Sequence, residues 1–66
     1  MRIDSKKLRF LMMENCMTVE ALAKAAGIGS ATVNILLHRE RKANLSTIGK
    51  VAKALNVAPK DLIKEE

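Results

Sequence analysis

Apolar residues recur along the chain every three or four positions, which is the spacing of amphipathic helices. The pattern predicts four helices, over residues 5–15, 19–26, 30–38 and 45–55, and a fifth helix that begins at Pro59. A proline fits the first turn of a helix because its missing N–H would have no partner there. Runs of β-branched and aromatic residues with a period of two, which would indicate strands, do not occur. We therefore predict an all-α fold, a compact domain of five short helices.

The residues at the predicted helix ends are suited to those positions. Asp4, Thr18 and Asn44 precede the first, second and fourth helices, and their side chains accept hydrogen bonds from the free N–H groups of a first turn. Gly27 and Asn56 follow the second and fourth helices. We expect both to adopt the left-handed conformation that commonly ends a helix, because glycine and asparagine tolerate a positive φ.

Stripes of apolar residues on these helices predict the hydrophobic core. The residues expected on the core side are Leu8, Leu11, Met12, Leu22, Ile28, Thr32, Val33, Leu36, Leu37, Leu45, Ile48, Val51, Ala52, Leu55, Leu62 and Ile63. Cys16 is interpreted as a small buried apolar residue, the methionines as core filler, and residues 1–3 as a lead-in. Phe10 and Met13 fall on another flank of the first helix. They either pack under the chain ends or are available to a partner.

Residues 19–38 have the pattern of a helix-turn-helix with Gly27 at its pivot. Ala23 lies one turn before this glycine, where the two helices approach closely and a larger side chain would force them apart. The side of the 30–38 helix that faces away from the core carries small, uncharged groups, namely Ser30, Ala31, Asn34 and His38, with Ile35 at its edge. A solvated helix face usually carries Lys and Glu. Small hydrogen-bonding groups indicate close approach to another molecule, and an ordinary polar face is the alternative.

Length and charge narrow the class of protein. A chain of 66 residues forms one domain, near the lower size limit for folding without a metal or disulfides. Twelve Lys and Arg against seven Asp and Glu give a net charge of +5, which favours a polyanionic partner, either nucleic acid or an anionic membrane. The single cysteine is unable to form an internal disulfide, and there is no signal peptide or apolar run of about 20 residues. We expect a cytoplasmic protein without a membrane partner.

Two segments carry a resemblance to a known family. L-A-K-A-A-G-I-G-S-A-T-V-N-I-L, Leu22 to Leu36, together with K-V-A-K-A-L-N-V, Lys50 to Val57, resembles the phage-repressor and Cro (XRE) family of DNA-binding regulators. The resemblance extends from Leu8 to about Ile63, nearly the whole chain. It implies a single lambda-repressor-like domain over 1–66, with the helix-turn-helix at 19–38 and double-stranded DNA as the partner.

In such a domain the helix over 30–38 enters the major groove of DNA, with its first residues nearest the base edges. The base contacts that the resemblance implies are Ser30, Ala31, Asn34, Ile35 and His38. Asn34 is able to pair with adenine through two hydrogen bonds, and apolar side chains are able to contact thymine methyl groups. The implied phosphate contacts are Thr18, Arg39, Arg41, Lys42 and Asn44. His38 has an equal alternative as a solvated residue at the negative end of its helix.

The chain departs from the family pattern at several positions. The usual glutamine that opens the second helix is Val19 here, and the polar residue, often glutamine, that opens the third helix is Ser30. The arginine–glutamate pair that often joins the first and third helices is replaced by Met12 and Leu37, for which we predict an apolar contact. The glycine common after the third helix is Arg39, so we expect a different exit from that helix.

Small repressors of this type are typically two-fold dimers that bind palindromic half-sites. The resemblance therefore implies a homodimer, with an interface at the end of the fourth helix and in the fifth. The candidate interface residues are Leu55, Val57, Leu62 and Ile63. The alternative is that all four simply belong to the core of the monomer.

The leading hypothesis is a dimeric, sequence-specific DNA-binding regulator, in the first place a transcriptional repressor. Two alternatives stay open: an antitoxin that represses its own genes and binds a toxin, and a helical protein-interaction module that has lost DNA binding. A toxin or an antirepressor is the kind of protein partner to be expected. The chain holds one His and one Cys, too few for a His/Cys metal cluster. No nucleophile–base pair, paired carboxylates or phosphate-binding glycine loop indicates an enzyme or a cofactor.

Overall fold

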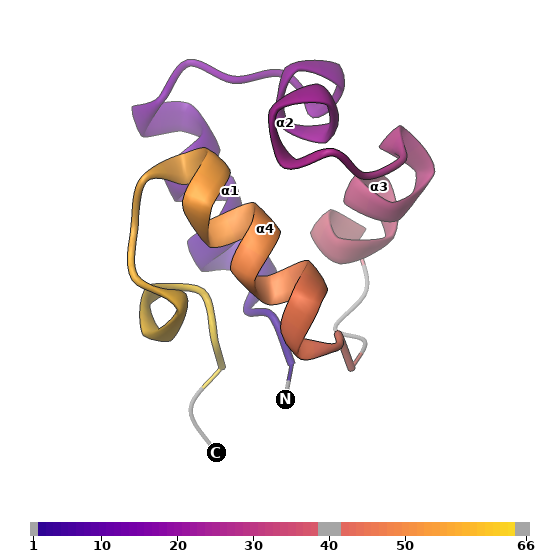
Figure 1. Ribbon diagram of the computed structural model, residues 1–66. Coiled ribbons are helices and arrows are strands. Elements are labelled where there is room, and N and C mark those ends of the chain that lie inside the picture. The colour runs from indigo at the N-terminus through magenta and orange to yellow at the C-terminus, as the bar shows by residue number, and fades with distance from the viewer. Residues whose placement is uncertain (1, 39–41, 65–66) are drawn as a thin grey trace.

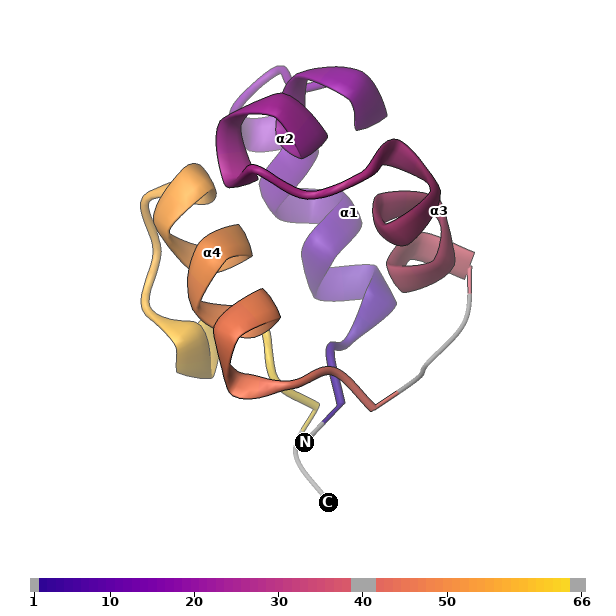
Figure 2. The ribbon, with the colours of Figure 1, turned by 45° about the vertical axis from the view of Figure 1, so that its right-hand side comes forward.

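The computed structural model describes residues 2–38 and 42–64, which form four α-helices and one short 3-10 helix. The helices are α1 (Ser5–Glu14), α2 (Val19–Ala26), α3 (Ser30–His38) and α4 (Leu45–Leu55), and the 3-10 helix is η1 (Pro59–Asp61) (Figure 1). Within these ranges the backbone forms no strand. In Figure 2, α1 runs through the centre of the view behind the other helices, with α3 on one side and α4 on the other. The all-α prediction is confirmed, and four of the five expected helices are present as α-helices.

The predicted N-terminal caps are all formed. The side chains of Asp4, Thr18 and Asn44 each accept a hydrogen bond from a backbone N–H of the helix that follows, at 2.9, 3.0 and 2.7 Å. Each bond satisfies one of the N–H groups that have no partner inside a helix. These three polar residues therefore decide where α1, α2 and α4 begin.

Three helices end in the same way, in a residue with a positive φ. Gly27 (φ 72°) and Asn56 (φ 57°) follow α2 and α4 as predicted, and Cys16 (φ 53°) adopts the same conformation after α1. In all three cases the next N–H donates to the carbonyl five residues back, at 2.9–3.0 Å, which is the Schellman arrangement. Cys16 is exposed, so its interpretation as a buried apolar residue is wrong. At this position of the backbone turn the side chain points toward solvent.

The core joins all four α-helices and both ends of the chain. Its buried members are Ile3, Leu8, Met12, Leu22, Ala23, Ala26, Val33, Leu36, Leu37, Ile48, Val51, Ala52, Leu55 and Leu62. Leu11, Ile28 and Ile63 pack against this core and are partly buried. Two expected members are exposed: Leu45, at 75%, and Thr32. Leu45 opens α4, and because Cα–Cβ bonds tilt toward a helix N-terminus, its side chain extends beyond the packed part of the helix.

The two ends of the chain are joined by backbone hydrogen bonds. Ile3 forms an isolated antiparallel bridge with Ile63, and on either side of it Asp4 N–H donates to the Leu62 carbonyl (2.7 Å) and Lys64 N–H to the Arg2 carbonyl (2.9 Å). Ile3 is only 1% exposed, so its interpretation as part of a lead-in is wrong. It contributes both a buried side chain and a pairing that closes the domain.

The expected fifth α-helix is a single 3-10 turn. Asp61 N–H donates to the Ala58 carbonyl at 2.9 Å, and Leu62 N–H donates to the Pro59 carbonyl at 3.0 Å, both bonds spanning three residues. Lys64 N–H donates to the Arg2 carbonyl, so it is not available to a carbonyl of a continued helix. Pairing with the N-terminal segment therefore replaces a fifth helix, which would also be too short to be stable alone.

Candidate nucleic-acid interface

A tight turn joins α2 to α3. Gly27 takes a left-handed φ of 72°, and Ile28 N–H donates to the Ala23 carbonyl at 3.0 Å. Ala23 is buried at 5% exposure, in the place where the sequence requires a small residue between the two helices. Ile28 is partly buried against the core. The turn thus fixes the direction in which α3 leaves α2.

One side of α3 is buried and the other is open. Val33, Leu36 and Leu37 are in the core. All five residues expected to contact bases are exposed in the monomer: Ser30, Ala31, Asn34, Ile35 and His38. The polar side chains of Ser30 and Asn34 have no hydrogen-bond partner among residues 2–38 and 42–64. The structure therefore keeps this small, uncharged face available to another molecule.

The C-terminal end of α3 is held by α1. Met12 and Leu37, at 6% and 7% exposure, are both core residues and line the same groove together with Arg9, Met13 and Met17. They lie on facing sides of α1 and α3, as the replacement of a charged pair by an apolar one predicts. The Arg9 guanidinium also donates a hydrogen bond to the Leu37 carbonyl, at 3.1 Å. These contacts fix the angle of α3 against the domain.

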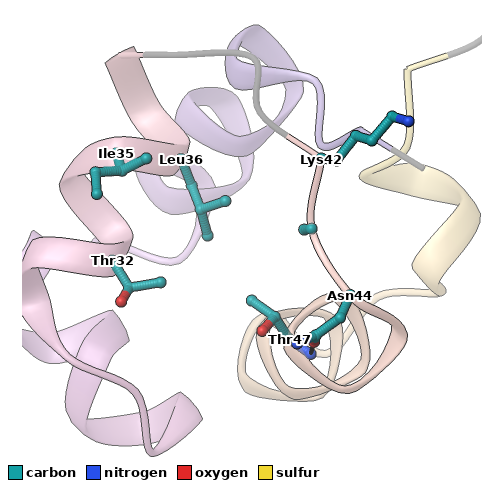
Figure 3. A pocket seen from close by; sticks show the side chains of 7 residues that line it. Thr32, Ile35, Leu36, Lys42, Asn44 and Thr47 are labelled. Atoms are coloured by element: carbon teal, nitrogen blue, oxygen red, sulfur yellow. Dashed lines mark hydrogen bonds between the residues drawn. The ribbon is translucent and has the colours of Figure 1, made fainter.

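A second groove, of about 240 Å³, separates α3 from the start of α4 (Figure 3). Its walls are Thr32, Ile35 and Leu36 on one side and Lys42, Ala43, Asn44 and Thr47 on the other. In Figure 3 the Lys42 side chain extends away from Ile35 and from α3. Thr32 and Thr47 belong to this surface although the sequence pattern did not predict it. Thr32 lies at the boundary between the buried and the exposed face of α3. There the position of a residue around the helix axis does not by itself predict whether its side chain is buried.

The candidate phosphate contacts include residues that precede α3 in the sequence and residues that follow it. Thr18, Lys42 and Asn44 are exposed, while Arg39 and Arg41 lie outside the described residues. The capping bonds leave hydrogen-bonding capacity on both cap side chains. The Thr18 hydroxyl accepts from Ala21 N–H and is still able to donate, and the Asn44 amide NH₂ is unused by the bond to Thr47 N–H.

The expected dimer interface is corrected by burial. Leu55 and Leu62 are 1% and 0% exposed, because both side chains are buried in the core of a single chain. Neither residue has surface left for a second subunit. Val57 and Ile63 are only partly buried. The Ile63 carbonyl accepts a hydrogen bond from the Lys7 ammonium at 3.4 Å, so this segment is tied to its own α1.

Residues 2–38 and 42–64 contain no group of three or more His, Cys, Asp or Glu side chains arranged to hold a metal ion. None of the helices in these ranges combines the length and the apolar character that crossing a bilayer requires.

Comparison with known proteins adds to this geometry. The family described as the Cro/C1-type HTH DNA-binding domain matches residues 7–66. A search of curated proteins gave no significant match. Among solved structures, the restriction-modification controller protein C.AhdI from Aeromonas hydrophila has a TM-score of 0.83 and 29% identity, over 89% of each chain.

Two further structures resemble this fold within a much larger protein. PhpD with cadmium and a mutant of hydroxyethylphosphonate dioxygenase have TM-scores of 0.85 and 0.87, both at 29% identity. Each match covers 98% of this chain and only 14% of the other. The likeness is limited to one small part of those proteins and is no indication of catalysis here.

Proposed function

This chain belongs to the Cro/C1-type HTH DNA-binding domain family, and we propose that it is a transcriptional repressor that binds a specific double-stranded DNA sequence as a homodimer. The observation that carries the proposal is the exposed face of α3, where the side chains of Ser30 and Asn34 have no hydrogen-bond partner among the described residues. The likeness to a controller protein over nearly all of both chains supports a regulatory role. Its proposed place of action is the cytoplasm, on the DNA.

In the proposed complex α3 lies in the major groove. Ser30 and Asn34 make hydrogen bonds to base edges, and Asn34 is suited to adenine because its amide both donates and accepts. Ala31 and Ile35 contact thymine methyl groups, and His38 contacts a groove edge or a phosphate. The apolar members of this face give the protein a preference for A·T pairs at their positions.

The backbone of the DNA is held from both sides of α3. On one side Thr18 stands at the N-terminus of α2, where free N–H groups and the helix dipole favour a phosphate. On the other side Lys42 and Asn44 precede α4, and Arg39 and Arg41 are the remaining proposed phosphate contacts, inferred from the sequence. A basic chain with a net charge of +5 supports this arrangement.

The test measures binding of the protein to DNA that flanks its own gene. Fluorescence anisotropy at a series of salt concentrations gives the binding constants. We expect the logarithm of the binding constant to fall linearly with the logarithm of salt, by about 0.9 for each phosphate contacted. An unrelated sequence of equal length is the control for specificity. Binding that is absent at low salt would contradict the proposal and favour a protein-interaction module instead.

Two variants separate the kinds of contact. Asn34→Ala is expected to reduce the preference for the flanking sequence over the control about tenfold, because one base-reading pair is worth about 1–3 kcal/mol. Arg41→Ala is expected to weaken binding to both sequences by a similar factor and to reduce the salt slope by about 1. If Asn34→Ala weakens both sequences equally, α3 does not read bases through this residue.

A further inference from the structure

Two large apolar side chains lie exposed beside each other on α1. Phe10 is 61% exposed and Met13 is 63% exposed. Residues three positions apart are neighbours on a helix surface, so the two side chains form one apolar patch. The other large exposed apolar residues among those described are Ile35, on the proposed base-reading face, and Leu45, at the start of α4. The patch on α1 has no role in the proposed DNA complex.

The patch continues into an apolar groove. Met13 lines a groove of about 260 Å³ together with Met12, Met17 and Leu37, with Arg9 as its polar member. Methionine side chains adapt to the shape of a partner because they are flexible and polarisable. We call the surface formed by Phe10, Met13 and Met17 the α1 surface. Contiguous exposed apolar surface is typical of interaction sites.

The charges around Phe10 fit a second copy of the same helix. Lys6 precedes Phe10 by four positions and Glu14 follows it by four, so the three residues form one ridge along the outer side of α1. Within 2–38 and 42–64 neither charged group has an ion-pair or hydrogen-bond partner for its side chain. Two such helices that pack antiparallel around Phe10 bring Lys6 of each copy opposite Glu14 of the other.

We propose that two copies of this chain associate through the α1 surface, with their α1 helices antiparallel and Phe10 at the two-fold axis. A two-fold interface must be complementary to itself, and the order Lys6–Phe10–Glu14 meets this condition in charge as well as in shape. The inference rests on the proposed homodimer and gives it an interface. The α1 surface takes the place of the region around Leu55 and Leu62 as the expected interface, because both leucines are buried in the core.

The area of the α1 surface sets the affinity expected between two copies. A standard interface buries about 800 Å² on each partner, which is about a sixth of the 4470 Å² of this chain. The ten residues of α1 span only about 15 Å, so the contact is smaller than the standard size. We expect a dimer that dissociates reversibly in the micromolar range of concentration.

The first test is sedimentation equilibrium of the full chain without DNA, over a range of protein concentrations. Phe10→Ser is expected to weaken dimerisation at least about tenfold, since a central aromatic residue dominates the energy of such a contact. Leu45→Ser is the matched control, because it removes an exposed apolar side chain outside the α1 surface, and it should dimerise like the unmodified protein. Thermal unfolding by circular dichroism verifies that both variants are folded.

The second test reverses the charges. Lys6→Glu and Glu14→Lys alone each place like charges opposite each other and should weaken the dimer, whereas the double variant should restore it. A monomer at all concentrations, an unaltered dimer in Phe10→Ser, or a double variant as weak as the single ones would each overturn the proposal. DNA binding is measured separately by anisotropy. Loss of the dimer interface and loss of DNA recognition are thereby distinguished.

Discussion

The Arg9 guanidinium on α1 donates a hydrogen bond to the Leu37 carbonyl on α3 across 3.1 Å, between residues 28 positions apart. The last carbonyls of a helix have no partner inside it, and a cation near them also interacts favourably with the helix dipole. Arg9 therefore stabilises the end of the proposed recognition helix from outside that helix. Together with the buried pair Met12 and Leu37, it attaches α3 to α1.

Removal of this bond should loosen α3 selectively. We expect Arg9→Met to lower the free energy of unfolding by about 0.5–1.5 kcal/mol, the usual contribution of one hydrogen bond. Urea denaturation followed by circular dichroism measures the change. Lys50→Met, at an exposed site on α4, is the control for loss of a positive charge and should leave stability unchanged. Equal stability of the two variants would show that the bond contributes nothing.

The pivot of the helix-turn-helix requires glycine for its backbone conformation. A Cβ at Gly27 would meet no atom within 4 Å, but the φ of 72° is strained for any other residue. Gly27→Ala should therefore destabilise the protein by about 1 kcal/mol. Gly49→Ala is the matched control, because Gly49 lies in α4 with free space around it and no positive φ. This second variant should stabilise the protein by about 0.5–1 kcal/mol, because alanine favours a helix. Thermal unfolding distinguishes the two signs.

Cys16 takes a left-handed conformation, with a φ of 53°, that glycine adopts without strain. We expect Cys16→Gly to raise the free energy of unfolding by about 0.5–1 kcal/mol. Cys16→Ala keeps the strain and removes the thiol, so it should be as stable as the unmodified chain. If both variants are equally stable, the stabilisation does not come from the backbone.

Two leucines with opposite surroundings test the position of the core. Leu62 is fully buried, whereas Leu45 is 75% exposed. Leu62→Ala should reduce stability by about 2–5 kcal/mol through lost burial and a cavity, enough to unfold much of a domain of this size. Leu45→Ala should alter stability by less than about 0.5 kcal/mol. Chemical denaturation of both variants gives the comparison, and similar losses would contradict the described packing.

Two asparagines are expected to contribute differently to stability. The Asn44 side chain caps α4 through Thr47 N–H at 2.7 Å, and Asn44→Ala should cost about 1 kcal/mol of stability. Asn34 is exposed on α3, and Asn34→Ala should leave stability within about 0.5 kcal/mol of the original. Thermal unfolding of both variants checks this contrast. A large loss of stability in Asn34→Ala would mean that this residue serves the fold rather than the DNA.

The local features of the chain were predictable because each depends on a few adjacent residues. Asp4, Thr18 and Asn44 cap helices as their side chains require, and Gly27 and Asn56 end helices with the expected positive φ. The periodic apolar stripe of α4 found its core residues except at the first turn, where Leu45 has nothing to pack against. Cys16 was missed because neither its type nor its neighbours indicate a left-handed residue.

The features that depend on distant segments were not predictable. Nothing near Ile3 in the sequence signals that it will pair with Ile63, and this pairing converts the expected fifth helix into one 3-10 turn. It also explains why Leu62 is a core residue rather than part of a dimer interface. The groove between α3 and α4 likewise has Thr32 and Thr47 on its opposite walls, two residues that no local pattern connects.

Local interactions along the chain specify the four α-helices, the turn at Gly27 and the small, uncharged face of α3, because caps, φ preferences and helical periodicity act over one or two turns. Which apolar side chains remain exposed depends on how the helices pack in three dimensions. Burial depends on what each side chain meets after the helices pack and the chain ends join. Leu55 and Leu62 are buried in the core, whereas Phe10 and Met13 are exposed on the surface. For this reason the proposed contact between two copies lies on α1.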